Sequence, residues 1–185
     1  MKPWLALALA AALLAGCQDS GSSNLPAPVA LTEEAAGHYC QMVVLDHPGP
    51  KGQAHLVGLQ YPLWFSQVRD ALAFDRMPEK MGDVAVIYVN DMGKAASWDE
   101  PGTTNWIDAR DAYYVQGSSR RGGMGAPELV PFAQEADARR FAETHGGSVL
   151  LHDDITAAMV LGPVDVDPDV PAPDVHSGDA DEVRG

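Results

Sequence analysis

The N-terminus limits what this chain of 185 residues can become. A single positive charge, Lys2, precedes an apolar run from Trp4 to Ala15, and small residues lead from there to Cys17. The run is short for a membrane-spanning helix, and this order of charge, apolar core and small residues is typical of a secretory signal. We therefore expect residues 1–16 to be removed, so that the mature protein folds in the cell envelope.

The segment Leu14-Ala15-Gly16-Cys17 resembles the lipobox of bacterial lipoproteins. This resemblance implies that the Cys17 thiol is acylated and that the mature, membrane-anchored chain begins there. Gln18, rather than aspartate, follows the cysteine. By the sorting pattern of such lipoproteins, this favours the outer membrane over the inner one, with the protein facing the periplasm. The alternative is an ordinary secreted protein whose cleavage site adjoins a cysteine.

Composition divides the rest of the mature chain. The segment after Cys17 is rich in Ser, Gly, Pro and Ala, which is typical of a flexible linker. The C-terminal end combines seven acidic residues with four prolines and cannot bury enough apolar surface to order itself. The expected parts are a signal (1–16), a lipidated flexible tether (17–36), one folded domain (37–161) and a disordered acidic tail (162–185).

The charge of the chain excludes some partners. The formal net charge is −14, and it becomes −15 once Lys2 leaves with the signal. Such an acidic protein repels nucleic acid and anionic lipid surfaces. We expect no nucleic acid partner, and attachment to the membrane through a covalent lipid.

The chain has only two cysteines, so lipidation of Cys17 leaves Cys40 as the single free thiol. Exported domains of this size use cysteines mainly in pairs, as disulfides. An unpaired thiol in an oxidising compartment instead suggests chemistry at Cys40. The alternative is a buried cysteine that packs as a small hydrophobe.

The surroundings of Cys40 favour a soft metal ion. The residues from Tyr39 to Leu45 are rich in aromatic and β-branched types, which predicts a strand. The two-residue period of a strand would place His38, Cys40 and Met42 on one face. Thiolate and thioether donors select Cu(I), whereas Zn(II) prefers several thiolates or imidazoles. We expect one Cu(I) ion, held transiently.

A second methionine is placed unusually. Met124 lies between glycines in Gly122-Gly123-Met124-Gly125, which predicts a mobile loop instead of a helix or strand. It is a candidate either for a third copper ligand or for a cover over the site. Met92, at the end of a predicted strand, is a reserve candidate.

The element pattern predicts an α+β protein. Apolar periodicity, prolines and glycines outline two successive ββαβ units, at about 37–95 and 103–161, which we expect to pack together because each is too small for a good core. The first unit is expected to contain strands at 39–45, 51–60 and 84–90 with a helix at 62–74. The second is expected to contain strands at 105–115, 129–132 and 148–152 with a helix at 135–145, and a short final helix at 154–161.

Three longer segments resemble the NosL family, the copper-binding accessory lipoproteins of nitrous oxide reductase. They are HYCQMVVLDHPGPKGQ, PLWFSQVRD with the later NDM, and GGMGAPELVPFAQEADARRFAETHGG, and together they run from about His38 to Ile155. The resemblance places the family's Cys-x-Met motif at Cys40 and Met42. It implies a Cu(I) chaperone that supplies the reductase's copper centres, working with the periplasmic component of an ABC transporter.

Three functions remain compatible with the sequence alone. The first is a metal-delivery protein that is not an enzyme, since the chain has no Ser-His-Asp grouping, phosphate loop or convincing pair of catalytic carboxylates. The second is an enzyme with Cys40 as its nucleophile and Asp46 or His38 as acid or base. The third is a non-metal envelope scaffold in which Cys40 is buried.

Overall fold

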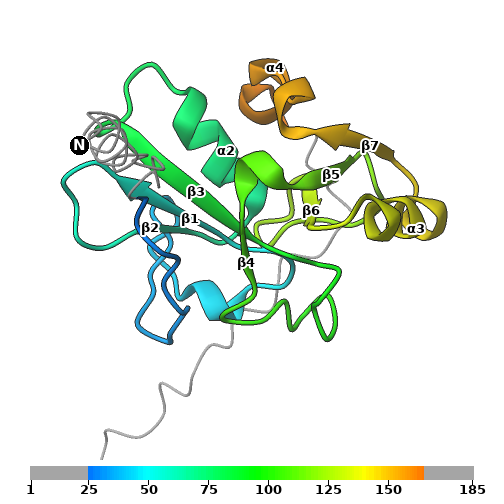
Figure 1. The fold of residues 1–185 in the computed structure, drawn as a ribbon, viewed down its shortest axis with the longest axis horizontal. Helices are drawn as coiled ribbons and strands as arrows, with labels where there is room; N and C mark the ends of the chain where they lie inside the picture. Colours follow the sequence, from blue (N-terminus) through cyan, green and yellow to red (C-terminus); the bar gives the residue numbers. More distant parts are fainter. Residues whose placement is uncertain (1–24, 165–185) are drawn as a thin grey trace, which may run out of the picture.

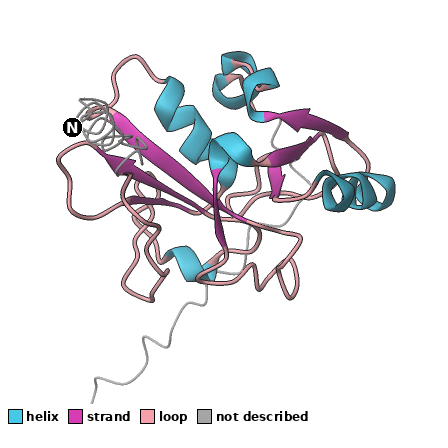
Figure 2. Ribbon diagram, viewed as in Figure 1, coloured by secondary structure: helices cyan, strands magenta, loops and turns pink. Residues whose placement is uncertain are grey.

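The computed structural model describes residues 25–164, which form two antiparallel sheets with helices packed beside them (Figures 1 and 2). The expected signal, lipidation site and acidic tail lie outside these residues, except for the first residues of that tail. Between residues 25 and 164, no helix has the length and apolar character needed to cross a membrane.

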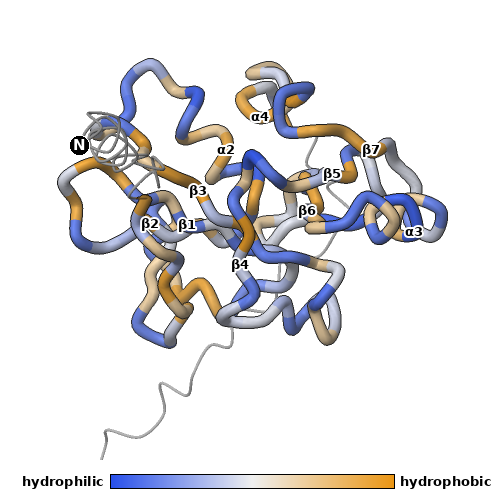
Figure 3. The backbone as a smooth tube through the Cα atoms, in the orientation of Figure 1, coloured by the Kyte–Doolittle hydropathy of each residue, from blue (hydrophilic) through white to orange (hydrophobic). Residues whose placement is uncertain are grey.

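The first sheet has the strand order β2-β1-β3-β4. Its strongest strand, β3 (Val84–Asn90), was predicted with the observed bounds and is one of the more hydrophobic stretches of the chain (Figure 3). Gly52 opens β1, and a Cβ at this position would stand 2.5 Å from Ala71, so glycine lets the helix lie close to the sheet. The elements of this part are β1 (Gly52–Leu56), β2 (Leu63–Phe65), α2 (Val68–Arg76), β3, and β4 (Trp106–Asp108).

The second sheet has the order β6-β5-β7, with α3 packed against it. The helix α3 (Glu135–His145) was also predicted with its observed bounds, and it ends at Gly146, whose φ of +77° suits glycine. The strands are β5 (Tyr113–Gln116), β6 (Val130–Phe132) and β7 (Ser148–Leu151), and the short helix α4 (Ala157–Leu161) follows.

The predicted α+β fold is confirmed, although some of its helices and strands differ from those expected. Both units run strand, strand, helix, strand, and β2-β1-β3 corresponds to β6-β5-β7. The segment 39–45 is not a strand; β1 begins the first unit instead. The predicted helix at 62–74 is in fact β2 followed by α2. The expected strand at 105–115 is divided into β4 and β5 by a 3-10 turn at Ala109–Asp111.

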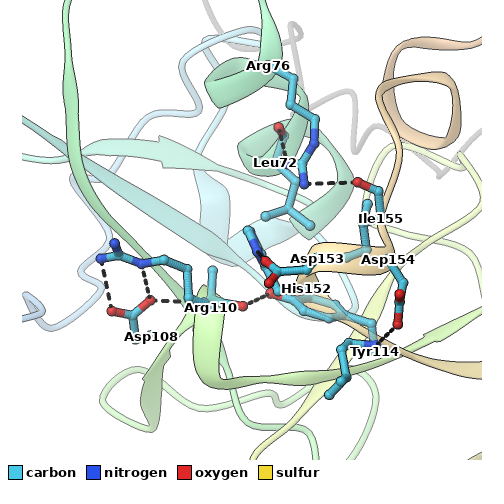
Figure 4. Close-up of polar contacts among 11 residues, drawn as sticks. Leu72, Arg76, Asp108, Arg110, Tyr114, His152, Asp153, Asp154 and Ile155 are labelled. Carbon is cyan, nitrogen blue, oxygen red and sulfur yellow. Dashed lines mark hydrogen bonds and ion pairs between the residues drawn. The ribbon is translucent and has the colours of Figure 1, made fainter.

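The main hydrophobic cluster contains residues of both units. Tyr114 from β5 is fully buried among residues of the first sheet and α2, and its hydroxyl donates to the Ala109 carbonyl oxygen at 2.6 Å. Arg76 at the end of α2 donates across the junction to the carbonyl oxygen of Ile155 at 3.1 Å (Figure 4). Each unit therefore completes the hydrophobic core of the other, as the small size of each one predicted.

A buried carboxyl group reinforces this junction. Glu128, just before β6, accepts backbone N–H bonds from Val68 (3.1 Å) and Arg69 (2.9 Å) at the start of α2, and from Leu129. The first N–H groups of a helix have no partner within the helix, so Glu128 of the second unit satisfies two donors of the first. Burial raises the pKa of Glu128 to about 8, although its hydrogen bonds to the backbone favour the ionised form.

The tether is packed against the domain over part of its predicted length. The side chain of Gln53 is fully buried and pairs with the backbone of Val29, accepting from its N–H (2.8 Å) and donating to its carbonyl oxygen (2.9 Å). The Tyr88 hydroxyl donates to the Pro26 carbonyl oxygen at 2.8 Å. The prediction of a flexible tether over residues 17–36 is therefore wrong for 26–31, which cover the face of the first sheet opposite α2.

Replacing Glu128 by glutamine tests the buried carboxylate. Folding raises the pKa of Glu128 from 4.5 to about 8, so between these values the folded state holds a proton that the unfolded chain releases. The free energy of unfolding of the wild type should therefore fall with rising pH, relative to Glu128→Gln, by up to about 1.4 kcal/mol per pH unit. Urea unfolding at a series of pH values measures this difference, and parallel profiles for the two proteins would contradict it.

Candidate metal centre

Cys40 lies in a tight turn beside β2. The Gly37 N–H donates to the Met42 carbonyl oxygen and the Gln41 N–H to the Gly37 carbonyl oxygen, both at 2.8 Å. Gln41 has a φ of +59°, which no regular strand contains. This self-contained turn explains why the predicted strand is wrong, and it removes the shared strand face expected for His38, Cys40 and Met42.

The turn is fixed to the edge of the first sheet. The His38 N–H donates to the Trp64 carbonyl oxygen of β2 at 2.7 Å. The Cys40 Sγ lies 3.5 Å from the Oγ of Ser66, the residue that follows β2. A Cβ on Gly37 would stand 2.5 Å from this sulfur, so glycine is what lets the turn close around the thiol. Cys40 is partly exposed.

The thiol opens into a pocket of about 240 Å³. The first unit supplies most of its wall, and Met124 of the second unit supplies the rest. The lining residues are Gly37, His38, Tyr39, Cys40, Phe65, Ser66, Asp70 and Met124.

One wall of the pocket is aromatic. The His38 ring packs against Phe65 and Phe74, with ring centroids 5.7 and 5.4 Å apart, and against Tyr39. At the rim, the Tyr39 hydroxyl donates to the Met77 sulfur at 3.5 Å. An apolar wall beside a thiol lowers the local dielectric and favours a soft ion of low charge over a hard, hydrated one.

The loop that carries Met124 is held in place. The Met124 N–H donates to Gln67 Oε1 (3.3 Å), and the Gly123 carbonyl oxygen lies 3.1 Å from His47 Nδ1. A Cβ on Gly123 would stand 2.7 Å from both the His47 Cβ and the Ser66 carbonyl oxygen. The glycines therefore serve close packing against the β2–α2 junction, and the expectation of a mobile loop is not met.

The NosL family profile matches residues 28–160. The chain is 54% identical over 160 residues to the copper-binding lipoprotein NosL of Achromobacter cycloclastes, covering 86% of this chain and 82% of that protein. It is 41% identical to the protein of the same name from Stutzerimonas stutzeri, over 72% of this chain and 68% of that one. This chain belongs to the NosL family.

A solved NosL structure has the same fold. The crystal structure of the copper chaperone NosL from Shewanella denitrificans aligns with a TM-score of 0.67 at 33% identity, over 71% of this chain and 97% of that one. The resemblance to the NosL family and the α+β fold class, both predicted from the sequence, are thereby confirmed.

Within this NosL fold, the predicted site residues do not share one strand face as the sequence predicted. Cys40, His38 and Met124 line one pocket, whereas Met42 is exposed and is absent from the lining. Met92, the reserve candidate, packs against the core of the second unit.

Two polar side chains of the pocket were missed by the sequence reasoning. They are Ser66 and Asp70, from the end of β2 and the first turn of α2. Burial raises the pKa of Asp70, against hydrogen bonding with Gln67 that lowers it. Neither residue stands near Cys40 in the sequence, so only the folded β2–α2 junction reveals them.

Gly123→Ala tests the packing of the Met124 loop. The added methyl group has no room against His47 and Ser66, so we expect a loss of about 1–3 kcal/mol in the free energy of unfolding. Gly82→Ala is the matched control, because its nearest neighbour would be a Leu56 methyl at 4.0 Å, and we expect a change below about 0.5 kcal/mol. Urea unfolding compares the two, and equal effects would contradict the packing argument.

Proposed function

We propose that this protein binds one Cu(I) ion in the Cys40 pocket and delivers it to other proteins of the envelope. The observation that carries the proposal is a partly exposed thiol and a methionine from the other unit in the wall of one open pocket. Thiolate and thioether are soft donors that match Cu(I). The names of the relatives, copper-binding lipoprotein and copper chaperone, support copper as the cargo.

We assign the ligands as Cys40, with Met124 and His38 as further donors from the pocket wall. Met42 is the next candidate, because its exposed side chain is long and flexible and belongs to the same turn as Cys40. Over residues 25–164, no group of three His, Cys, Asp or Glu side chains is arranged to hold a metal ion. Methionine sulfur is therefore a suitable further donor for a soft ion at Cys40.

The alternatives have less support. A scaffold with Cys40 buried would need an inaccessible thiol, yet Cys40 is partly exposed. For a thiol enzyme, Asp46 is exposed and lies outside the lining of the pocket, so of the two acid–base candidates predicted from the sequence only His38 is in place. Asp70 supplies a titratable carboxyl group to the lining. Binding and release, without catalysis, fit the site better.

For delivery, we propose that the acceptors are nitrous oxide reductase and the periplasmic component of its associated ABC transporter, as the family resemblance implies. An open pocket with few protein donors suits transfer, because an acceptor's donors can enter before the ion leaves. We further propose that Cys17 carries the lipid and that the protein faces the periplasm from the outer membrane. The name lipoprotein for the relatives supports an anchored protein.

Cys40→Ala should abolish tight Cu(I) binding by the reduced mature protein, because it removes the only thiolate of the pocket. Titration against a chromogenic Cu(I)-selective chelator measures the affinity. Circular dichroism of the variant controls for folding. An affinity equal to that of the wild type would overturn the proposed site.

Methionine variants distinguish the methionines that bind copper from those that do not. Met124→Leu keeps side-chain size but removes sulfur, and it should weaken Cu(I) binding by roughly tenfold or more, at least as much as the loss of an outer-shell partner of a ligand. Met42→Leu applies the same change to the next candidate. Met81→Leu is the matched control, since Met81 is exposed and lies outside the pocket. The same chelator competition measures all three, and equal affinities for Met124→Leu and Met81→Leu would remove Met124 from the ligand set.

A further inference from the structure

One apolar surface has no part in the Cys40 pocket. In the loop between β1 and β2, Val57 is 69% exposed, Tyr61 is 74% exposed and Leu59 is also exposed. Met81, 66% exposed, lies in the neighbouring loop between α2 and β3. The Val57 N–H donates to the Asp83 carbonyl oxygen at 2.9 Å and joins the two loops. We call these four side chains, Val57, Leu59, Tyr61 and Met81, the apolar tip.

The N-terminal segment leads toward the apolar tip. The Tyr88 ring lies against His55, with centroids 5.7 Å apart, and its hydroxyl holds the Pro26 carbonyl oxygen. His55 precedes Val57 by two residues, so Tyr88 holds Pro26 beside the part of β1 that leads into the tip. Eight residues lie between Cys17 and Pro26, and the nine Cα–Cα steps of this stretch span at most about 30 Å when fully extended.

We propose that the apolar tip contacts the membrane in which Cys17 is anchored, with its four side chains among the headgroups of zwitterionic lipids. The inference rests on the proposed lipidation of Cys17. Exposed apolar clusters mark interaction surfaces, and a tyrosine suits the boundary between headgroups and acyl chains. A weak contact is sufficient, because the short anchor keeps the tip at high effective concentration near the bilayer.

The charges around the tip determine which lipids it accepts. Glu79 and Asp83 flank Met81, and Lys80 is already paired with Asp75 at 3.1 Å. With a net charge of −15 on the mature chain, these carboxylates would repel an anionic surface. Phosphatidylethanolamine, which has no net charge, is the headgroup that fits.

The contact would also orient the copper pocket. The tip follows Leu56, the last residue of β1. At the other end, the first residue of β1, Gly52, pairs with Phe65 of β2. Ser66, which lies next to Cys40, directly follows Phe65. The tip and the Cys40–Ser66 pair therefore lie at opposite ends of β1. A domain resting on its apolar tip holds this pair on the side away from the lipid, where protein acceptors can approach it.

Photo-crosslinking tests the contact with the lipidated mature protein. The protein is reconstituted in phosphatidylethanolamine–phosphatidylcholine vesicles that contain a diazirine-bearing phosphatidylethanolamine, and adducts are mapped by mass spectrometry. We expect adducts on residues 57–61 and 81–83, and few on residues 148–161. Combined Val57→Ser, Leu59→Ser and Tyr61→Ser substitutions should remove most adducts from the loop.

The matched control removes exposed apolar side chains elsewhere, by Leu151→Ser with Leu161→Ser, and should leave the adduct pattern unchanged. Cu(I) binding by each variant confirms that it is folded. Adducts as frequent on 148–161 as on 57–61, or insensitive to the triple substitution, would overturn the proposal. Failure of the lipidation premise appears separately, as a mature protein without acyl mass that does not float with the vesicles.

Discussion

The arrangement of this protein depends on one buried carboxyl group. Glu128 belongs to the second unit, yet it accepts the free N–H groups at the start of α2 in the first. The residues just before that helix are Ser66, beside the thiol, and Gln67, which accepts the Met124 N–H. A Cβ on Gly122 would stand 2.6 Å from both Gln67 Oε1 and Glu128 Oε2, so the Met124 loop packs directly on this junction.

The candidate copper site is therefore a property of the junction between two small units. Cys40 comes from a turn on the edge of the first sheet, and Met124 comes from a loop of the second unit. An ion held by both would link the units with bonds that the unfolded chain cannot make, so binding would also stabilise the packing. Release to an acceptor would then need only the few soft donors in the pocket to exchange, with the fold unchanged.

Sequence reasoning was sufficient where local signals dominate. The apolar run 84–90 and the helix 135–145, which ends at Gly146, were predicted with their observed bounds. The prediction of a strand at 39–45 was wrong because two features outweigh the strand propensity of these residues. They are the left-handed backbone conformation of Gln41 and the hydrogen bonds within the turn. Cys40 was predicted because it is the single free thiol, and Met124 because it lies between glycines; both also stand in segments that resemble the NosL family. Their meeting in one pocket depends on long-range packing, which no local pattern encodes.

X-ray absorption at the copper edge tests the central claim most directly, because it counts the sulfur atoms bound to the metal. Protein loaded with one Cu(I) should show sulfur from both Cys40 and Met124, and Met124→Leu should lower the fitted number of sulfur neighbours. A sulfur shell unchanged in Met124→Leu, or a wild-type site bound only by nitrogen and oxygen, would contradict a copper site formed between the two units.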